Sequence, residues 1–374
     1  MEQAFHAERI FDGAVWHRDA ALLVKAGRVA AILPSAAAPA GERVADWLVP
    51  GLIDLQVNGG GGVLFNNDPT PEGIATICAA HARFGTTATM VTLITDRPDV
   101  TARAIAAAEA APRTPGFLGL HLEGPHLSQA RKGTHDPALI RPMAPADLAR
   151  LAGAARSLPF LICTIAPEAV TPAQVAALAE AGAVVSLGHT DCSAETAMAH
   201  AAAGARMVTH LFNAMSQLQH RAPGLVGAAL DDGRLHAGLI ADGFHVADAA
   251  LRVALRGKQG PGQMFLVSDA MSTIGTDLGG FTLNGRQIFR RGGRLTLADG
   301  TLAGADIALI DAVRHCHMAL GLPLERALAL ATAAPAAAMG IVDRGHLRPG
   351  AAADFLALTP GVEVAATWIA GVRA

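Results

Sequence analysis

The chain has 374 residues, a length that accommodates one large α/β domain and a small one. Hydrophobic residues make up 51% of the chain and charged residues 16%, whereas an average globular protein has about 25% charged residues. This deficit predicts much buried surface and leaves room for a subunit interface. The net charge of −3 argues against an electrostatic field that would attract nucleic acid or an anionic membrane.

Targeting and membrane signals are not visible in the sequence. No basic region followed by an apolar core begins it, and no run of about 18 uninterrupted apolar residues occurs in it. We therefore expect a cytoplasmic protein without a signal peptide or a membrane span. The four cysteines, which form no C-x-x-C pair, are expected to be reduced structural thiols. They are Cys78, Cys163, Cys192 and Cys316.

Both ends of the chain have the pattern of short β-strands bounded by turn residues. The apolar runs cover residues 4–11, 21–25 and 28–32 near the start and 355–358 and 364–369 near the end. We predict that the two ends pair in one small β-sandwich domain, made of residues 1–49 and 345–374. The remaining residues, 50–344, would form a larger domain inserted into it.

Within this larger segment, apolar strands alternate with helices. The strand candidates are residues 48–58, 86–94, 117–123, 160–166, 183–189, 207–213, 236–245 and 264–270. Helices are expected at 70–84, 98–111, 144–157, 171–181, 193–204 and 247–256. This alternation indicates a parallel sheet buried on both faces, and eight units predict an α/β fold of the (β/α)8 TIM-like barrel type. A doubly wound open sheet, the alternative, explains less well why polar residues end so many strands.

A glycine-rich region, residues 275–304, follows the eighth strand candidate. Asn284-Gly285 and Arg291-Gly292-Gly293 are hairpin signals within it. We expect this region to form a lid or an insert beside the barrel mouth. Two further helices are expected after it, at 306–320 and 323–340.

Polar side chains at the strand ends point to a metal site. His189 and His210 end two neighbouring strands, and the carboxyl ends of barrel strands share the face that carries the chemistry. With Glu123 they would form a two-histidine, one-carboxylate site, which suits Zn²⁺, Fe²⁺ or Mn²⁺ and leaves a position open for water. Asp269 could then act as the general base, so the predicted chemistry is hydrolysis. His121, two residues before Glu123, is expected to lie in the barrel interior rather than bind the metal.

Less specific interpretations of these residues exist. Each histidine could satisfy a local hydrogen bond, Glu123 could pair with a basic residue, and Asp269 could cap a helix or a turn. The combination of all four residues at strand ends favours the metal site over these separate structural roles.

A series of motifs extends over nearly the whole chain. They are P-G-L-I-D-L-Q-V-N-G at 50–59, H-L-E-G-P-H at 121–126, K-G-T-H at 132–135, L-G-H-T at 187–190, T-H-L-F-N-A-M at 209–215, R-A-P-G at 221–224, I-A-D-G-F-H at 240–245, V-S-D-A at 267–270, G-T-L-A-G at 300–304 and G-H-L-R-P-G-A-A-A-D-F at 345–355. In this order the chain resembles the N-acetylglucosamine-6-phosphate deacetylases of the amidohydrolase superfamily.

The resemblance implies a role for each matching residue. It makes Glu123, His189 and His210 the ligands of one divalent metal ion per subunit, with Zn²⁺ expected and Fe²⁺, Mn²⁺ or Co²⁺ as alternatives. Asp269 becomes the general base and then the acid, and His135 polarises the acetamide carbonyl. The residues implied to contact the sugar phosphate are Thr134, His135, Asn213, Ala214, Arg221, Asp242, His245, Leu302, Ala303 and Gly304. The resemblance also implies a homodimer in which some substrate contacts cross the interface.

One departure concerns the number of metal ions. Many amidohydrolases carry His-x-His at the end of the first strand and hold two metals, whereas this chain has Gln56 and Asn58 there. Neutral amides are weak ligands for transition metals, so the sequence resembles the single-metal branch of the superfamily.

The expected reaction is hydrolysis of N-acetylglucosamine 6-phosphate to glucosamine 6-phosphate and acetate, in amino-sugar catabolism. N-acetylgalactosamine 6-phosphate is an alternative substrate, because the two sugars differ at one hydroxyl. Another amidohydrolase, acting on a cyclic amide or a purine, would leave Asn213 and Arg221 without a phosphate to bind. A non-catalytic barrel that serves as an interaction scaffold would be indicated by a missing metal ligand or general base, and none of these residues is missing from this sequence.

Overall fold

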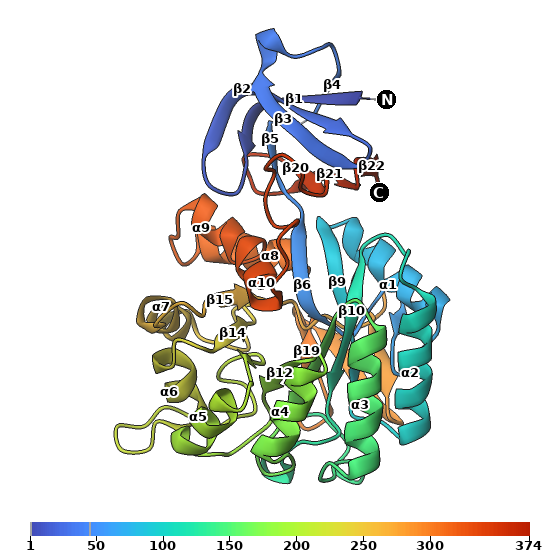
Figure 1. Cartoon of the computed structure of the whole chain (residues 1–374), viewed down its shortest axis with the longest axis vertical. Helices are drawn as coiled ribbons and strands as arrows, with labels where there is room; N and C mark the ends of the chain where they lie inside the picture. Colours follow the sequence, from blue (N-terminus) through green and yellow to red (C-terminus); the bar gives the residue numbers. More distant parts are fainter. Residues whose placement is uncertain (1, 45) are drawn as a thin grey trace.

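The computed structural model describes residues 2–44 and 46–374. Two sheets organise the molecule, one built from both ends of the chain and one built from the middle (Figure 1). The terminal sheet lies at one end of the molecule and contains both the N-terminal and the C-terminal strands (Figure 1). Among the described residues, no helix combines the length and the hydropathy that a membrane crossing needs.

The terminal sheet pairs the two ends of the chain, as the sequence predicts. Its strands are β1 (Glu2–Phe11), β2 (Trp16–Lys25), β3 (Arg28–Pro34), β4 (Glu42–Arg43), β5 (Trp47–Pro50), β20 (Phe355–Leu358), β21 (Val364–Ile369) and β22 (Val372–Arg373). They form one hydrogen-bonded sheet in the order β22-β21-β20-β5-β1-β2-β3, with β4 beside β1. Phe5, Phe355 and Trp368 pack against one another in its core, with ring centroids 4.9–5.6 Å apart.

The middle of the chain forms eight parallel strands that nearly close into a barrel. They are β6 (Leu52–Val57), β9 (Thr86–Ile94), β10 (Phe117–Glu123), β11 (Leu161–Ile165), β12 (Val184–Leu187), β13 (Met207–Val208), β14 (His236–Leu239) and β15 (Met264–Leu266). Each strand pairs with the next along the chain, and a parallel bridge between Val57 and Ala270 links the first strand to the segment after the last. The TIM-like barrel is therefore confirmed, and the open-sheet alternative is excluded.

With one exception, the helices between the strands begin where the sequence indicates. They are α1 (Pro71–Ala82), α2 (Pro98–Ala110), α3 (Pro145–Ser157), α4 (Pro172–Glu180), α5 (Ala194–Ala202), α6 (Gly224–Asp231) and α7 (Asp248–Gly257). The first four start with proline, whose fixed φ suits the first helical position. The hydroxyls of Thr70 and Thr171 cap α1 and α4 by accepting the backbone N–H groups of Gly73 and Gln174.

Several predicted elements are wrong in extent. The predicted strand 48–58 is split, because residues through Pro50 belong to β5 of the terminal sheet and β6 begins at Leu52. Helix α6 was not expected, because seven of its eight residues are buried and its sequence shows no polar face. The single helix expected at 323–340 is two, α9 (Leu324–Ala329) and α10 (Ala333–Met339), preceded by α8 (Leu309–Met318).

The strands that carry the predicted site are also shorter than expected. Strand β12 ends two residues before His189, and β13 ends two residues before His210. Both histidines, and Asp269 after β15, have positive φ angles of 49°, 28° and 50°. A left-handed backbone cannot continue a strand, so each chain segment leaves the sheet where a site residue occurs.

The glycine-rich region forms a four-stranded antiparallel sheet, the insert sheet. Its strands are β16 (Gly280–Leu283), β17 (Arg286–Arg291), β18 (Arg294–Thr296) and β19 (Leu302–Ala305). The turns fall at Asn284-Gly285 and Gly292-Gly293, where all four residues have positive φ. Its apolar side chains pack on Leu64, Ile94 and Met271 of the barrel, so this sheet is anchored beside the mouth. The remaining short elements are β7 (Gly59–Gly60), β8 (Val63–Leu64) and the 3-10 turns at Ser35–Ala37 and Gln129–Arg131.

An apolar cluster fills part of the barrel interior, and the cysteines are buried, as the composition predicts. Alanines of α10 belong to this cluster together with Ile53 and Met90 of the barrel strands. All four cysteines are buried and unpaired.

Candidate active site

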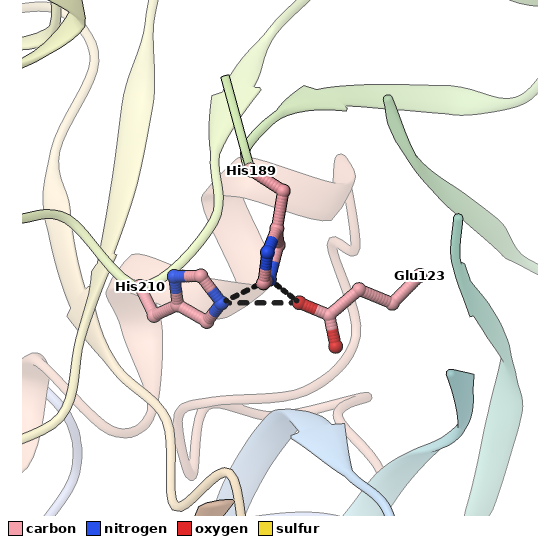
Figure 2. Close-up of side chains that lie close together, drawn as sticks. All are labelled: Glu123, His189 and His210. Carbon is pink, nitrogen blue, oxygen red and sulfur yellow. Dashed lines mark hydrogen bonds and ion pairs between the residues drawn. The ribbon is translucent and has the colours of Figure 1, made fainter. Parts of the chain in front are cut away.

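Glu123, His189 and His210 converge at the carboxyl end of the barrel (Figure 2). The Oε1 atom of Glu123 lies 3.1 Å from Nε2 of His189 and 3.0 Å from Nε2 of His210, and the two nitrogen atoms are 3.1 Å apart. All three residues are buried. Three ligand atoms at this spacing can reach one metal ion, since Zn²⁺ binds such groups at about 2.0–2.2 Å.

The surroundings prepare these residues for a cation. The Nδ1 atom of His189 lies 2.9 Å from the carbonyl oxygen of Arg131, which it can donate to, leaving a lone pair on Nε2. Burial raises the pKa of Glu123, but hydrogen bonds with His189 and His210 outweigh it and hold that pKa well below its usual range. Glu123 is therefore a carboxylate, the form in which it binds metals.

Asp269 lies beside this cluster and is held through one oxygen. Its Oδ1 atom accepts hydrogen bonds from Nε2 of Gln56 at 3.1 Å and from Nδ2 of Asn58 at 2.7 Å. Among the described residues, none donates to Oδ2. Burial, followed by the charge of Glu123, raises the pKa of Asp269 to about 6. A carboxylate with this pKa is suited to proton transfer near neutral pH.

Gln56 and Asn58 lie where the sequence analysis places the missing metal ligands. The Nε2 atom of Gln56 also donates to Oε2 of Glu123, at 3.2 Å. Its two amide hydrogens thus connect the carboxylates of Glu123 and Asp269. Both amide groups thus present hydrogen-bond donors to these carboxylates, and neutral amides are weak ligands for a second transition metal.

A cavity of about 230 Å³ opens over these groups. Its lining includes most residues that the sequence analysis selected: Asn58, Glu123, Thr134, His135, His189, His210, Asn213, Ala214, His245, Asp269, Leu302 and Gly304. Gly304 brings β19 to within contact of the active-site backbone. A Cβ atom there would lie 2.9 Å from the carbonyl oxygen of Asp269, and its φ of 69° also favours glycine.

Three predicted substrate residues do not line the cavity. Asp242 lies behind His245, and its Oδ2 atom is 2.6 Å from Nδ1 of that histidine. Ala303 belongs to the buried core of the insert sheet. Arg221 is exposed on the loop before α6 and faces a separate surface depression shared with Arg131 and Asp191. Within one chain, Arg221 is therefore not positioned over the mouth of this cavity.

His135 occupies the wall of the cavity next to the metal cluster. Its ring centroid lies 4.4 Å from that of His189, and burial holds the pKa of His135 well below its usual range. The ring is therefore neutral. Its Nδ1 atom lies 2.8 Å from the hydroxyl oxygen of Thr95, which directly follows β9. Thr95 is not among the predicted site residues, although it has the feature that identified the others, a polar side chain at a strand end.

His121 lies in the barrel interior, below the metal cluster. Its Nε2 atom is 2.7 Å from the hydroxyl oxygen of Thr164, and Thr164 is 2.7 Å from the hydroxyl oxygen of Thr209. His121 is not among the residues that converge on the cluster.

Comparison with known proteins agrees with this geometry. The sequence profile described as the amidohydrolase family matches residues 47–374. The chain is 41% identical to N-acetylgalactosamine-6-phosphate deacetylase of a Shewanella species over 326 residues, which are 87% of this chain and 82% of that protein. It is 36% identical to N-acetylglucosamine-6-phosphate deacetylase of Danio rerio, with 87% and 83% of the two chains covered.

A solved structure matches along the whole chain. The crystal structure of N-acetylglucosamine-6-phosphate deacetylase from Pasteurella multocida superimposes with a TM-score of 0.95, at 31% identity and with all of both chains covered. The resemblance seen in the sequence motifs is thereby confirmed. This chain belongs to the amidohydrolase family, and its fold is that of the family's N-acetylglucosamine-6-phosphate deacetylases.

Proposed function

We propose that the protein hydrolyses the acetamide group of N-acetylglucosamine 6-phosphate, producing glucosamine 6-phosphate and acetate in amino-sugar catabolism. One observation carries the proposal: a metal-binding cluster and a carboxylate with a raised pKa line the same cavity. The names of the relatives described above agree with it.

Glu123, His189 and His210 would hold one divalent ion per subunit, and Zn²⁺ fits this nitrogen and oxygen ligand set. Fe²⁺, Mn²⁺ and Co²⁺ are the alternatives. The ion would supply the Lewis acid that polarises a water molecule and the acetamide carbonyl. The donor orientation of Gln56 and Asn58 supports a single ion.

Asp269 takes the proton from the attacking water through Oδ2, because Oδ1 already accepts two amide hydrogens. The new C–O bond forms as the carbonyl oxygen gains negative charge. Asp269 then returns the proton to the nitrogen as the C–N bond breaks, so the amine and acetic acid leave with one water consumed, and the acid loses its proton to the amine or to solvent to become acetate.

His135 stabilises the negative carbonyl oxygen by donating from Nε2. Its low pKa keeps the ring neutral, and the Thr95 hydroxyl can donate to Nδ1, which places the ring hydrogen on Nε2. Asp242 acts on the substrate through His245, since it accepts from Nδ1 of that ring and leaves Nε2 toward the cavity.

The positions of the residues predicted to bind the 6-phosphate also favour a homodimer. Thr134, Asn213 and Ala214 line the cavity, whereas Arg221 is exposed outside it in the same chain. We place Arg221 in the phosphate site of the partner subunit, reaching over from its own surface loop. A phosphorylated, charged substrate is a cytoplasmic metabolite, which supports a cytoplasmic location.

We also divide the chain into a small β domain, residues 1–49 and 345–374, and an inserted barrel, residues 50–344. The separate aromatic core of the terminal sheet supports this division. The connection is short, since only Gly51 lies between β5 and β6.

A second substrate is favoured by one comparison. The Shewanella relative, at 41% identity, is named for N-acetylgalactosamine 6-phosphate. The test is acetate release measured side by side on both sugar phosphates and on N-acetylglucosamine without phosphate. A kcat/KM for N-acetylglucosamine 6-phosphate at least tenfold above the other two is the expected result, and acetate release from neither sugar phosphate would refute the proposal.

A further inference from the structure

The barrel has a seam between its first and last strands. Strands β6 and β15 are the two ends of the sheet, and they share no regular ladder. Beyond β15, the backbone N–H of Asp269 donates to the carbonyl oxygen of Gln56 at 3.0 Å, and that of Asn58 donates to Ala270 at 2.8 Å. The general base of the proposed reaction therefore lies on the seam itself.

Asp54 closes the next position along this seam with its side chain. The backbone N–H of Ser268 lies 3.2 Å from Oδ1 and 3.3 Å from Oδ2 of Asp54. Oδ1 also accepts the backbone N–H of Gln56, at 3.2 Å. The carboxylate thus takes the place that a backbone carbonyl of a neighbouring strand has in a continuous sheet.

A carboxylate at this position is costly. Asp54 is 0% exposed, and among the described residues no basic side chain pairs with it. Burial raises its pKa to about 7. A buried carboxyl group held only by neutral donors, here the N–H groups of Gln56 and Ser268 and the Ser268 hydroxyl, destabilises a fold relative to an apolar side chain, so its presence calls for a function.

The backbone beside Asp54 is the part of the site that needs support. Asp269 has a φ of 50°, which a residue other than glycine adopts at a cost in energy. Its carbonyl oxygen accepts the N–H of Ala305 at 2.9 Å, and the hydroxyl of Ser268 accepts the N–H of Ala270 at 3.2 Å. Asp54 and the Ser268 hydroxyl are the side-chain groups in this arrangement, and they act on the residues on either side of Asp269.

We propose that Asp54 is a positioning residue for Asp269: its carboxylate, together with the Ser268 hydroxyl, holds the strained backbone turn that aims Asp269 at the substrate. This inference rests on the proposed function, because Asp269 is the base of that reaction. Asp54 does not line the cavity, so it acts through Ser268 and not on the substrate.

Asp54→Asn is the most direct test. The amide keeps the size of the side chain but replaces one carboxylate oxygen with an NH₂ group. In one orientation this NH₂ group faces the N–H of Ser268, donor against donor. In the other it replaces the oxygen that accepts from both Ser268 and Gln56. Misplacement of a catalytic group by about 1 Å can cost about 10² in rate. We expect kcat to fall at least tenfold, with KM within twofold and metal content unchanged.

Asp354→Asn is the matched control. Asp354 is also buried, and its Oδ1 atom accepts a backbone N–H, that of Ala370, at 2.8 Å. It directly precedes β20, far along the chain from the seam, and unlike Asp54 it also pairs with a basic residue, Arg344. A merely structural role for Asp54 would lower the melting temperature in both variants and kcat in neither.

Hydrogen exchange provides a measurement that does not depend on catalysis. The backbone amide hydrogens of residues 264–271 should exchange faster in Asp54→Asn than in wild type, and at an unchanged rate in Asp354→Asn. Ser268→Ala removes only the hydroxyl group and leaves the surrounding apolar packing in place. It should accelerate exchange of the same peptide to a smaller extent and lower kcat about two- to fivefold. This variant takes over the test if Asp54→Asn does not fold.

The outcomes separate the inference from the proposed function. Wild-type enzyme that releases no acetate would refute the proposed function, while exchange would still report on the seam. Unchanged exchange at 264–271 together with kcat within twofold of wild type, in Asp54→Asn or in its substitute Ser268→Ala, would overturn the role of Asp54.

Discussion

The hydroxyl oxygen of Thr95 lies 2.8 Å from Nδ1 of His135. In the proposed mechanism the hydroxyl donates to Nδ1, in preference to the carbonyl oxygen of Glu123 at 3.4 Å, and this leaves the ring hydrogen on Nε2. The neutral ring can then donate to the carbonyl oxygen of the substrate. Thr95 thus prepares His135 for its proposed role without contacting the substrate.

Thr95→Val should lower kcat about tenfold. The substitution keeps the shape of the side chain but removes the hydroxyl, so part of the population has the wrong tautomer, whereas loss of a whole oxyanion donor costs about 10²–10³. Steady-state kinetics of Thr95→Val and His135→Ala would be compared. If Thr95→Val matches wild type, the hydroxyl does not control the tautomer, and a loss as large as that of His135→Ala would mean a wider disturbance.

The protein should retain about one metal ion per chain, because three ligands converge and the amides beside them are weak ligands for a transition metal. His189→Ala should lose retained metal and activity together. His200→Ala is a suitable control, since His200 is also a buried histidine but hydrogen-bonds within and beside α5. Elemental analysis after dialysis gives the ratio, and two equivalents in wild type would contradict the single-ion proposal.

The strand ends were the part of the site that the sequence could predict. Eight apolar runs identified the barrel, and a shared face then brought His189 and His210 together with Glu123. The same logic does not extend to Arg221, because it follows a strand only after a loop. A loop's direction depends on packing that no local pattern encodes, and here the loop leads away from the cavity of its own chain.

Helix α6 and Asp54 show a second limit. A helix buried on nearly every side has no polar face, so its periodicity is invisible in the sequence. Asp54 falls in the same apolar run as Gln56, yet its role depends on the gap between the two ends of the sheet. Such a gap is a property of barrel closure, not of any one strand.

Asp269→Asn should retain the metal and lose most of kcat. The amide preserves shape but cannot accept the proton, and general base catalysis contributes roughly 10²–10⁴ in rate. Because Asp269 serves as both base and acid, we expect the upper part of this range. Steady-state kinetics and elemental analysis of the same preparation give kcat and the metal content. A kcat within tenfold of wild type would mean that another group accepts the proton from the attacking water.

The midpoint of the acidic limb in the pH profile of kcat/KM should lie at or below pH 6. Burial and the charge of Glu123 raise the pKa of Asp269 to about 6. Only the deprotonated carboxylate is a base, so activity falls as the pH drops through this pKa. A metal ion beside Glu123 offsets part of that negative charge and moves the limb lower. The dependence of kcat/KM on pH measures it, and a midpoint above pH 7 would exclude Asp269 as the titrating base.

Arg221→Ala should weaken the use of the phosphorylated sugar about 10- to 10³-fold in kcat/KM, since a charge-assisted hydrogen bond contributes about 1.5–3 kcal/mol and guanidinium can make two. N-acetylglucosamine without the phosphate should be unaffected. Equal loss on both sugars would mean that Arg221 supports the fold and does not bind the phosphate.

Mixed dimers can show from which subunit Arg221 acts. Arg221→Ala protein keeps Asp269, and Asp269→Asn protein keeps Arg221, so neither variant alone has a complete site. If Arg221 reaches into the partner subunit, a mixed dimer regains one complete site, and random mixing in equal amounts restores about one site in four. If Arg221 serves its own chain, both sites of the mixed dimer stay defective and mixing restores nothing. The exposed position of Arg221, outside the cavity of its own chain, leads us to expect recovery after the two proteins are unfolded and refolded together.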